Sequence, residues 1–263
     1  MQENIVWHLV SSPDPVGESP SSILAASKAS GLVPSFLACL LFTITLPGFS
    51  FTLTTLAAAE AAGASTNKWD AEIQAFLEQD RLNPPGKGDI LFTGSSSIRL
   101  WKGVETNFPG FKVFARGFGG SHLSDLVHQA PRIVVPYAPA RILVYEGDND
   151  IASGKTPARV LEDFKDFVRL VHSKLPDSRI SYICIKPSKA RWHLKEPIQE
   201  TNRMIREFCQ NQPRLGFIDV WKPMLDDTGG FREELFVADG LHLNASGYSI
   251  WQRVIGDHLA KGR

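Results

Sequence analysis

Short apolar segments alternate with longer segments of helical spacing from about residue 67 to the C-terminus, and this alternation constrains the fold more than any other feature. Five segments are short and rich in β-branched or aromatic residues: 89–93, 111–115, 141–146, 179–185 and 215–220. Residues 158–175 and 246–260 instead space their apolar side chains as amphipathic helices do. Strands alternating with helices predict a parallel sheet covered on both faces. Because no repeat or linker interrupts residues 67–263, we expect them to form one domain.

Polar, glycine-containing segments follow the predicted strands. Residues 94–97, 116–122 and 147–154 come directly after the first three strands, and residues 237–244 lie beyond the fifth. The carboxyl ends of parallel strands meet at one edge of a sheet, where ligands bind in such folds. These segments therefore bring a serine, an Asp/His pair and several candidate oxyanion donors to one place. Those groups are the components of a serine acyl-transfer site.

The first 66 residues differ in composition from the rest of the chain. No charged residue occurs between Lys28 and Glu60, and the apolar run ends in small residues around Ala62 and Ala64. A basic residue, an apolar run and an Ala-x-Ala-like end are typical of an export signal. The leader before this run is long and acidic for such a signal, so a later translation start is one explanation. We expect residues 1–66 to direct export to the periplasm or the exterior.

A retained membrane anchor over residues 31–59 is the alternative, since this run is long enough to span a bilayer. Pro34 and Pro47 disfavour an unbroken helix there, so we favour export with cleavage. The membrane is expected as a partner only through this segment.

Charge and cysteine content argue against a nucleic-acid partner and against a metal cluster. The 28 lysines and arginines equal the 28 aspartates and glutamates, so no long-range field steers the chain to nucleic acid. Cys39 is interpreted as a small apolar residue of the N-terminal run. Cys184 and Cys209 are expected to be two free buried thiols rather than a disulfide, and nothing indicates a metal cluster.

Four short motifs after the predicted strands occur in a recognisable order. They are Gly94-x-Ser96, Gly120 in "GFGGS", Gly147-x-Asn149-Asp150 and Asp239-x-x-His242. In this order and context, the chain resembles the SGNH (GDSL-type) hydrolases over residues 67–263. Two positions depart from the family pattern, because Ser95 and Ser121 stand where aspartate is usual. Neither position belongs to the family's triad or oxyanion hole, so the departures concern local loop bonding and substrate fit.

The resemblance implies a role for each motif residue. Ser96 would be the nucleophile, His242 the base and Asp239 the carboxylate that orients the imidazole. The backbone N–H groups of Ser96 and Gly120 and the side-chain amide of Asn149 would form the oxyanion hole. The resemblance also implies a flavodoxin-like three-layer α/β/α sandwich with five mostly parallel strands, and a reaction without metal or organic cofactor.

The motif residues could instead have purely structural roles. The serines at 95–97 could cap a helix, and Asp239 could cap the last helix, although Asn244 also suits that position. His122 is the nearest competitor of His242. The loop containing Asn149 lacks the ligand spacing of an EF-hand, and the glycine-rich segments do not match nucleotide-binding motifs.

The sequence thus predicts a serine esterase whose partner is a small ester, with acetyl and other small acyl groups, including those of acetylated sugars, as first candidates. A lysophospholipase or thioester acylhydrolase is the alternative, and a catalytically silent binding module is another. Residues 186–197 follow the fourth strand and carry Trp192 and His193 among several cations. We expect these two residues to contact the alcohol side of the substrate, with packing of Trp192 on the sheet as the competing interpretation. The oligomeric state does not follow from the sequence.

Overall fold

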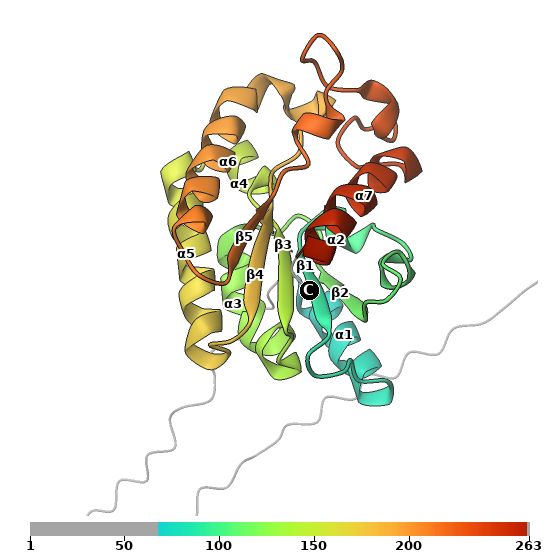
Figure 1. Cartoon of the computed structure of the whole chain (residues 1–263), viewed down its shortest axis with the longest axis vertical. Coiled ribbons are helices and arrows are strands. Elements are labelled where there is room, and N and C mark those ends of the chain that lie inside the picture. The colour runs from blue at the N-terminus through green and yellow to red at the C-terminus, as the bar shows by residue number, and fades with distance from the viewer. Residues whose placement is uncertain (1–67, 262–263) are drawn as a thin grey trace, which may run out of the picture. The chain divides into compact units, whose positions relative to one another are not determined.

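A computed structural model of the chain describes residues 68–261 (Figure 1). The expected export signal or anchor, its cleavage site and Cys39 lie outside the described residues. Within the described range, no helix has the length and apolar character that crossing a membrane requires.

Five strands form one wholly parallel sheet. Their bounds are Ile90–Gly94 (β1), Val113–Gly117 (β2), Arg141–Tyr145 (β3), Arg179–Ile183 (β4) and Leu215–Ile218 (β5). The spatial order is β2-β1-β3-β4-β5, which is the flavodoxin-like order, and every neighbouring pair is parallel. The predicted fold class is confirmed.

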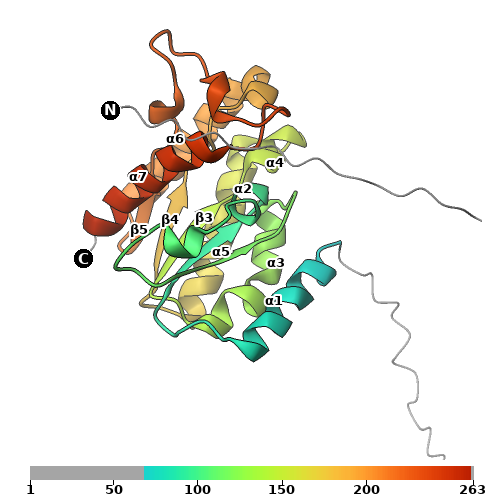
Figure 2. The same cartoon turned by 90° about the vertical axis from the view of Figure 1, so that its right-hand side faces the viewer.

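Helices cover both faces of this sheet (Figure 2). The helices are Asp70–Leu82 (α1), Ser96–Arg99 (α2), Leu123–Ile133 (α3), Asp148–Ala152 (α4), Pro157–Lys174 (α5), Lys195–Gln210 (α6) and Ala245–Lys261 (α7). Short 3-10 helices span Val104–Thr106 (η1), Val135–Tyr137 (η2), Lys189–Leu194 (η3), Lys222–Met224 (η4) and Glu233–Leu235 (η5). Helices α1, α3, α5 and α6 contribute to one hydrophobic core, whereas α2 and α7 contribute to the other.

The two helices predicted most clearly from periodicity begin and end within one residue of their expected bounds. The Oγ1 atom of Thr156 accepts a hydrogen bond from the N–H of Arg159, and Pro157 occupies the first position of α5. At the start of α7, the Oδ1 atom of Asn244 accepts hydrogen bonds from the N–H groups of Ser246 and Gly247. Side-chain caps thus fix where both helices begin.

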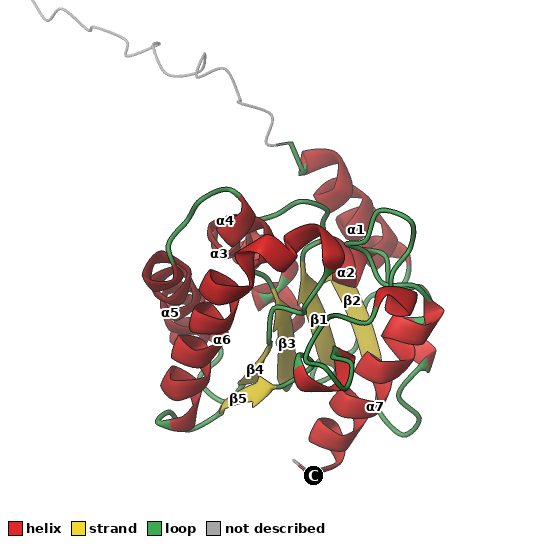
Figure 3. Cartoon of the chain, turned by 90° about the horizontal axis from the view of Figure 1, so that it is seen from above, coloured by secondary structure: helices red, strands yellow, loops and turns green. Residues whose placement is uncertain are grey.

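The carboxyl edge of the sheet is the edge that carries the motif residues. Gly94 at the end of β1 pairs with Gly117 of β2 and with Tyr145 of β3, so these three strands end in register. The short helices α2 and α4 follow β1 and β3 almost at once, near the strand ends seen from above in Figure 3. The motifs that follow β1, β2 and β3 therefore begin side by side at the carboxyl edge of the sheet.

Candidate active site

Ser96 is the first residue of α2 and follows a tight turn that requires glycine at position 94. Gly94 has φ +132°, and a Cβ atom at this position would overlap the carbonyl oxygen of Tyr145. The N–H of Ser95 donates to that same carbonyl oxygen at 3.1 Å, which holds the turn against β3. Ser96 is half-buried, whereas Ser95 and Ser97 are each 2% exposed. Of the three adjacent serines, Ser96 is therefore the one that a substrate can reach.

The Ser96 hydroxyl contacts His242, which lies 146 residues later in the chain. The Oγ atom of Ser96 is 3.0 Å from Nε2 of His242, and Nδ1 of His242 is 2.6 Å from Oδ2 of Asp239. The histidine and aspartate side chains are 26% and 46% exposed, so the relay is open to solvent on one side. Hydroxyl, imidazole and carboxylate thus form one continuous chain of hydrogen bonds.

The charge of Asp239 fixes the tautomer of the imidazole. Partial burial raises the pKa of Asp239, but hydrogen bonds from the ring and backbone of His242 and from the N–H of Leu241 lower it to about 2 overall. The carboxylate accepts and cannot donate, so Nδ1 carries the proton when the ring is neutral. Nε2 then presents its lone pair to the Ser96 hydroxyl, as a general base requires.

The loop that holds Asp239 and His242 is closed by its own backbone. The N–H of Val237 donates to the carbonyl of His242 at 2.9 Å, and Gly240 adopts φ +64° between the two functional residues. The N–H of Ala190 in η3 donates to the carbonyl of Gly240 at 3.0 Å. Because Asn244 caps α7, Asp239 is not needed as a helix cap and is available to the imidazole.

The Asn149 side chain is held between two of the motifs. Its Nδ2 group donates to the Oγ atom of Ser95 at 2.8 Å and to the carbonyl oxygen of Ser121 at 3.0 Å. The Ser95 side chain makes no cap bond, so it does not cap the helix as the alternative interpretation of the serines would have it, and it instead orients this amide. In the part of the chain that the structure describes, the N–H groups of Ser96 and Gly120 have no hydrogen-bond partner. Both remain able to bind an incoming anion.

Helix α1 supports the loop that carries Gly120. Gly120 is exposed and adopts φ +72°, and its neighbour Gly119 is bonded on both sides. The indole N–H of Trp69 donates to the Gly119 carbonyl at 2.9 Å, and the Gly119 N–H donates to Oε2 of Glu72 at 3.2 Å. Sequence reasoning missed this support, because α1 carries few buried apolar residues.

The acidic residues that flank Asn149 have structural partners. Asp150 is fully buried and accepts hydrogen bonds from the Leu123 N–H and from Nζ of Lys155. Oδ2 of Asp148 accepts from Nζ of Lys186 at 3.0 Å and from the Tyr145 hydroxyl at 3.1 Å. Sequence reasoning gave Asp148 and Lys186 no partner, since 38 residues separate them.

Trp192 packs in an aromatic cluster at the ends of β4 and β5. Its ring stacks on Trp221 with centroids 6.1 Å apart and meets Phe231 edge-on at 5.3 Å. Trp192 is half-buried and His193 is exposed, and within residues 68–261 no hydrogen bond or ring contact joins either side chain to the relay residues. A contact with substrate by these two residues stays a prediction.

The other candidate side chains have ordinary roles. The backbone N–H of His122 donates to the Asp125 carboxylate at 2.8 Å at the start of α3, so His122 belongs to a helix entry. Cys184 and Cys209 are free and buried, as expected. Burial raises the pKa of each thiol to about 12. No group of three or more potential metal ligands lies within the described residues.

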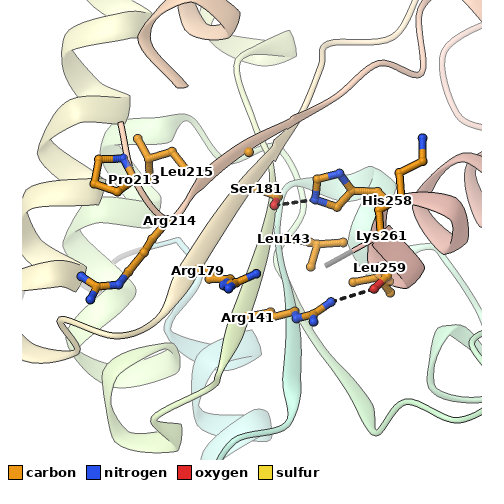
Figure 4. Close-up of a pocket in the computed structure, with 11 residues that line it drawn as sticks. Arg141, Leu143, Arg179, Ser181, Pro213, Arg214, Leu215, His258, Leu259 and Lys261 are labelled. Carbon is orange, nitrogen blue, oxygen red and sulfur yellow. Dashed lines mark hydrogen bonds between the residues drawn. The ribbon is translucent and has the colours of Figure 1, made fainter. Parts of the chain in front are cut away.

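A cavity of about 570 Å³ opens at the opposite edge of the sheet (Figure 4). Arg141 and Arg179, which line it, are the first residues of β3 and β4. His258 of α7 also lines the cavity and lies 2.9 Å from the Ser181 hydroxyl. This cavity is thus separate from the edge that carries Ser96.

Known structures with the same arrangement of elements come from bacteria and a fungus. A candidate platelet activating factor of Streptococcus pneumonia is 22% identical, with a TM-score of 0.64 over 72% of this chain and 92% of that one. A GDSL-like lipase of Bacteroides thetaiotaomicron is 16% identical, with a TM-score of 0.63 over 73% and 99%. A carbohydrate esterase family 3 protein of Talaromyces cellulolyticus is 16% identical, with a TM-score of 0.52 over 66% and 96%. No curated protein matches the chain significantly.

A parallel α/β/α sandwich with a hydroxyl–imidazole–carboxylate relay at its carboxyl edge defines a class of proteins suited to acyl transfer. The family model that matches residues 94–250 makes this class specific. The chain belongs to the GDSL-like lipase/acylhydrolase family and is a carboxylic ester hydrolase. The family resemblance inferred from the four motifs is confirmed.

Proposed function

We propose that this enzyme hydrolyses esters of small acyl groups, acetylated carbohydrates first among them, through the triad of Ser96, His242 and Asp239. The observation that carries the proposal is the relay itself, with 3.0 Å from Ser96 Oγ to His242 Nε2 and 2.6 Å from His242 Nδ1 to Asp239 Oδ2. Both distances lie within hydrogen-bond range, so proton transfer from Ser96 to His242 needs no rearrangement.

Acylation begins when Ser96 Oγ attacks the carbonyl carbon of the ester. Nε2 of His242 takes the hydroxyl proton as the new C–O bond forms, and Asp239 stabilises the imidazolium. The proton then passes from Nε2 to the alcohol oxygen as the bond to the leaving alcohol breaks. An acyl group on Ser96 and a neutral His242 are left.

Deacylation repeats these steps with water as the nucleophile. His242 removes a proton from water, the hydroxide attacks the acyl carbon, and Ser96 leaves with the proton that His242 returns. In each half-reaction, the carbonyl oxygen becomes an oxyanion. The free N–H groups of Ser96 and Gly120 are two of the donors that we propose for it. The third is the Asn149 amide, which keeps its bond to the Ser121 carbonyl and turns its other N–H from the Ser95 hydroxyl to the oxyanion.

The proposed substrate class rests on the openness of the site and on one fold neighbour. The relay side chains are partly exposed. Acetyl groups on sugars are small esters on a hydrophilic carrier, and the Talaromyces neighbour is described as a carbohydrate esterase. We further propose that residues 1–66 export the enzyme, which would place residues 67–263 with extracellular or periplasmic esters.

A chain-length series of p-nitrophenyl esters, together with an acetylated oligosaccharide, tests this proposal. We expect turnover to be highest for acetyl and to fall with chain length, and we expect acetate release from the oligosaccharide. Highest turnover on long acyl chains would favour a lipid esterase instead. No turnover on any ester would mean that the chain is a silent binding module.

A further inference from the structure

Glu146 is a fully buried carboxyl group that the triad chemistry leaves without a role. It directly follows β3 and is 0% exposed. Its Oε1 atom lies 2.6 Å from the Oγ atom of Ser121, while no group within the described residues bonds its Oε2 atom. Burying an ionised carboxylate with one unbonded oxygen is strongly unfavourable.

The contact between Ser121 and Glu146 depends on which of the two side chains supplies the proton. The Ser121 hydroxyl lies close to two oxygens, Oε1 of Glu146 and the carbonyl oxygen of Phe118 at 2.9 Å. A hydroxyl has one proton and can donate to only one of them. If Glu146 is the neutral acid, its own O–H donates to Ser121 Oγ, and the Ser121 hydroxyl donates to Phe118. Both contacts are then hydrogen bonds, with no oxygen pair left without a proton.

This pair lies behind the proposed oxyanion donors. Phe118 and Ser121 bracket Gly119 and Gly120, so the Ser121 hydroxyl ties the two ends of that short loop together. The carbonyl of Ser121 also accepts one of the two hydrogen bonds that hold the Asn149 amide. The position of the loop therefore sets both the Gly120 N–H and the Asn149 side chain.

We propose that Glu146 is a positioning residue which, as a neutral acid, donates a hydrogen bond to Ser121 and thereby fixes the oxyanion donors Gly120 and Asn149. The inference rests on the proposed function for its effect on catalysis. The protonation state that we infer for Glu146 does not depend on the proposed function. Ser121 stands where the family usually has aspartate, and here the Glu146 side chain, which follows β3, brings a carboxyl group to the Ser121 hydroxyl.

The charges around Glu146 agree with this state. Burial raises the pKa of Glu146 well above its ordinary value, the Ser121 contact and Lys155 lower it, and Asp150 and Asp125 raise it. These groups come from the segments packed around the carboxyl group, namely α3, α4 and the loop after α4. From β4, the Tyr182 hydroxyl donates to the Glu146 main-chain carbonyl at 2.6 Å. Because the two carboxylates outnumber the one lysine, a negative charge on Glu146 is unfavourable.

Infrared difference spectroscopy tests the protonation state without relying on activity. The Ser96→Ala protein and the Ser96→Ala/Glu146→Gln protein would be compared at pH 7. We expect a carbonyl stretching band of a protonated carboxylic acid in the first protein and not in the second. Absence of this band from the first protein would overturn the proposal, whether or not Ser96 proves to be the nucleophile.

Kinetics on p-nitrophenyl acetate test the positioning role. Glu146→Leu should lower kcat by about 10- to 100-fold with little change in KM, since small displacements of catalytic donors cost this much. Glu146→Gln should recover most of kcat, because its amide can donate to Ser121 as the acid does. In an Asn149→Ala background, Glu146→Leu should cost less than in the wild type. An unchanged kcat in Glu146→Leu, or no recovery in a folded Glu146→Gln, would refute the role.

Discussion

The buried ion pair between Asp148 and Lys186 lies directly beside the proposed oxyanion donor Asn149, and its removal should destabilise the enzyme strongly. Lys186 is 1% exposed, and its Nζ atom is 3.0 Å from Oδ2 of Asp148. The Tyr145 hydroxyl and Arg191 also face the carboxylate, so Asp148→Asn removes the charge that compensates two cations. The lysine would then remain buried without a carboxylate in contact.

The expected magnitude follows from that burial. Removing one partner of a buried pair typically costs about 3–5 kcal/mol, because the other charge is left uncompensated. In a domain of this size, each kcal/mol lowers Tm by about 2–4 °C, so we expect a decrease of roughly 6–20 °C. The exposed pair of Lys165 and Glu162 provides the control: Lys165→Met should cost less than about 1 kcal/mol.

Urea unfolding at several pH values measures this free energy. Burial raises the pKa of Asp148, but Lys186 and Arg191 lower it overall below its ordinary value. A carboxylate with a lowered pKa stabilises the fold above the unfolded-state pKa of about 3.9, and this stability is lost as the pH falls through the folded-state value. The difference between wild type and Asp148→Asn should therefore be constant from pH 5 to 8 and shrink below about pH 4. A cost below about 1 kcal/mol at pH 7, equal to the control, would refute the reasoning.

Three further substitutions test individual site residues. Asn149→Ala should lower kcat by about 10²–10³-fold with the fold intact, as loss of one oxyanion donor does, and a loss under threefold on p-nitrophenyl acetate would contradict that role. Asp239→Asn should lower kcat by about 10⁴-fold, because an amide no longer selects the imidazole tautomer; steady-state rates near wild type would exclude it from the triad. Trp192→Ala should slow hydrolysis of an acetylated oligosaccharide more than that of p-nitrophenyl acetate, whereas equal losses with a lower Tm would assign Trp192 to packing.

The parallel sheet could be predicted because its strands are continuous apolar runs with polar junctions at their carboxyl ends. The β1 and β3 segments are buried almost throughout, so their apolar character is visible without any partner. Helix α5 could be predicted for the same reason, since one of its faces is apolar from Val160 to Val171. Helix α1 was missed because Ile73 is its one fully buried residue, and its contacts with Gly119 are polar.

The triad candidates could be proposed from local spacing, but their support could not. Asp239 and His242 are three residues apart, so one turn brings them together. The contact of Ser121 with Glu146 joins residues 25 apart, and that of Asp148 with Lys186 joins residues 38 apart. Such pairs depend on which strands become neighbours and on which side chains point inward. A single sequence does not encode that choice in any local pattern.

The central claim is that Ser96, and neither of its neighbours, carries the acyl group. Mass spectrometry after reaction with a fluorophosphonate identifies the modified residue directly, since the reagent phosphonylates an activated serine. We expect stoichiometric modification of Ser96 in the wild type and in Ser97→Ala, and none in Ser96→Ala or His242→Ala. Modification of Ser95 or Ser97, or ester hydrolysis that persists in Ser96→Ala, would contradict the account.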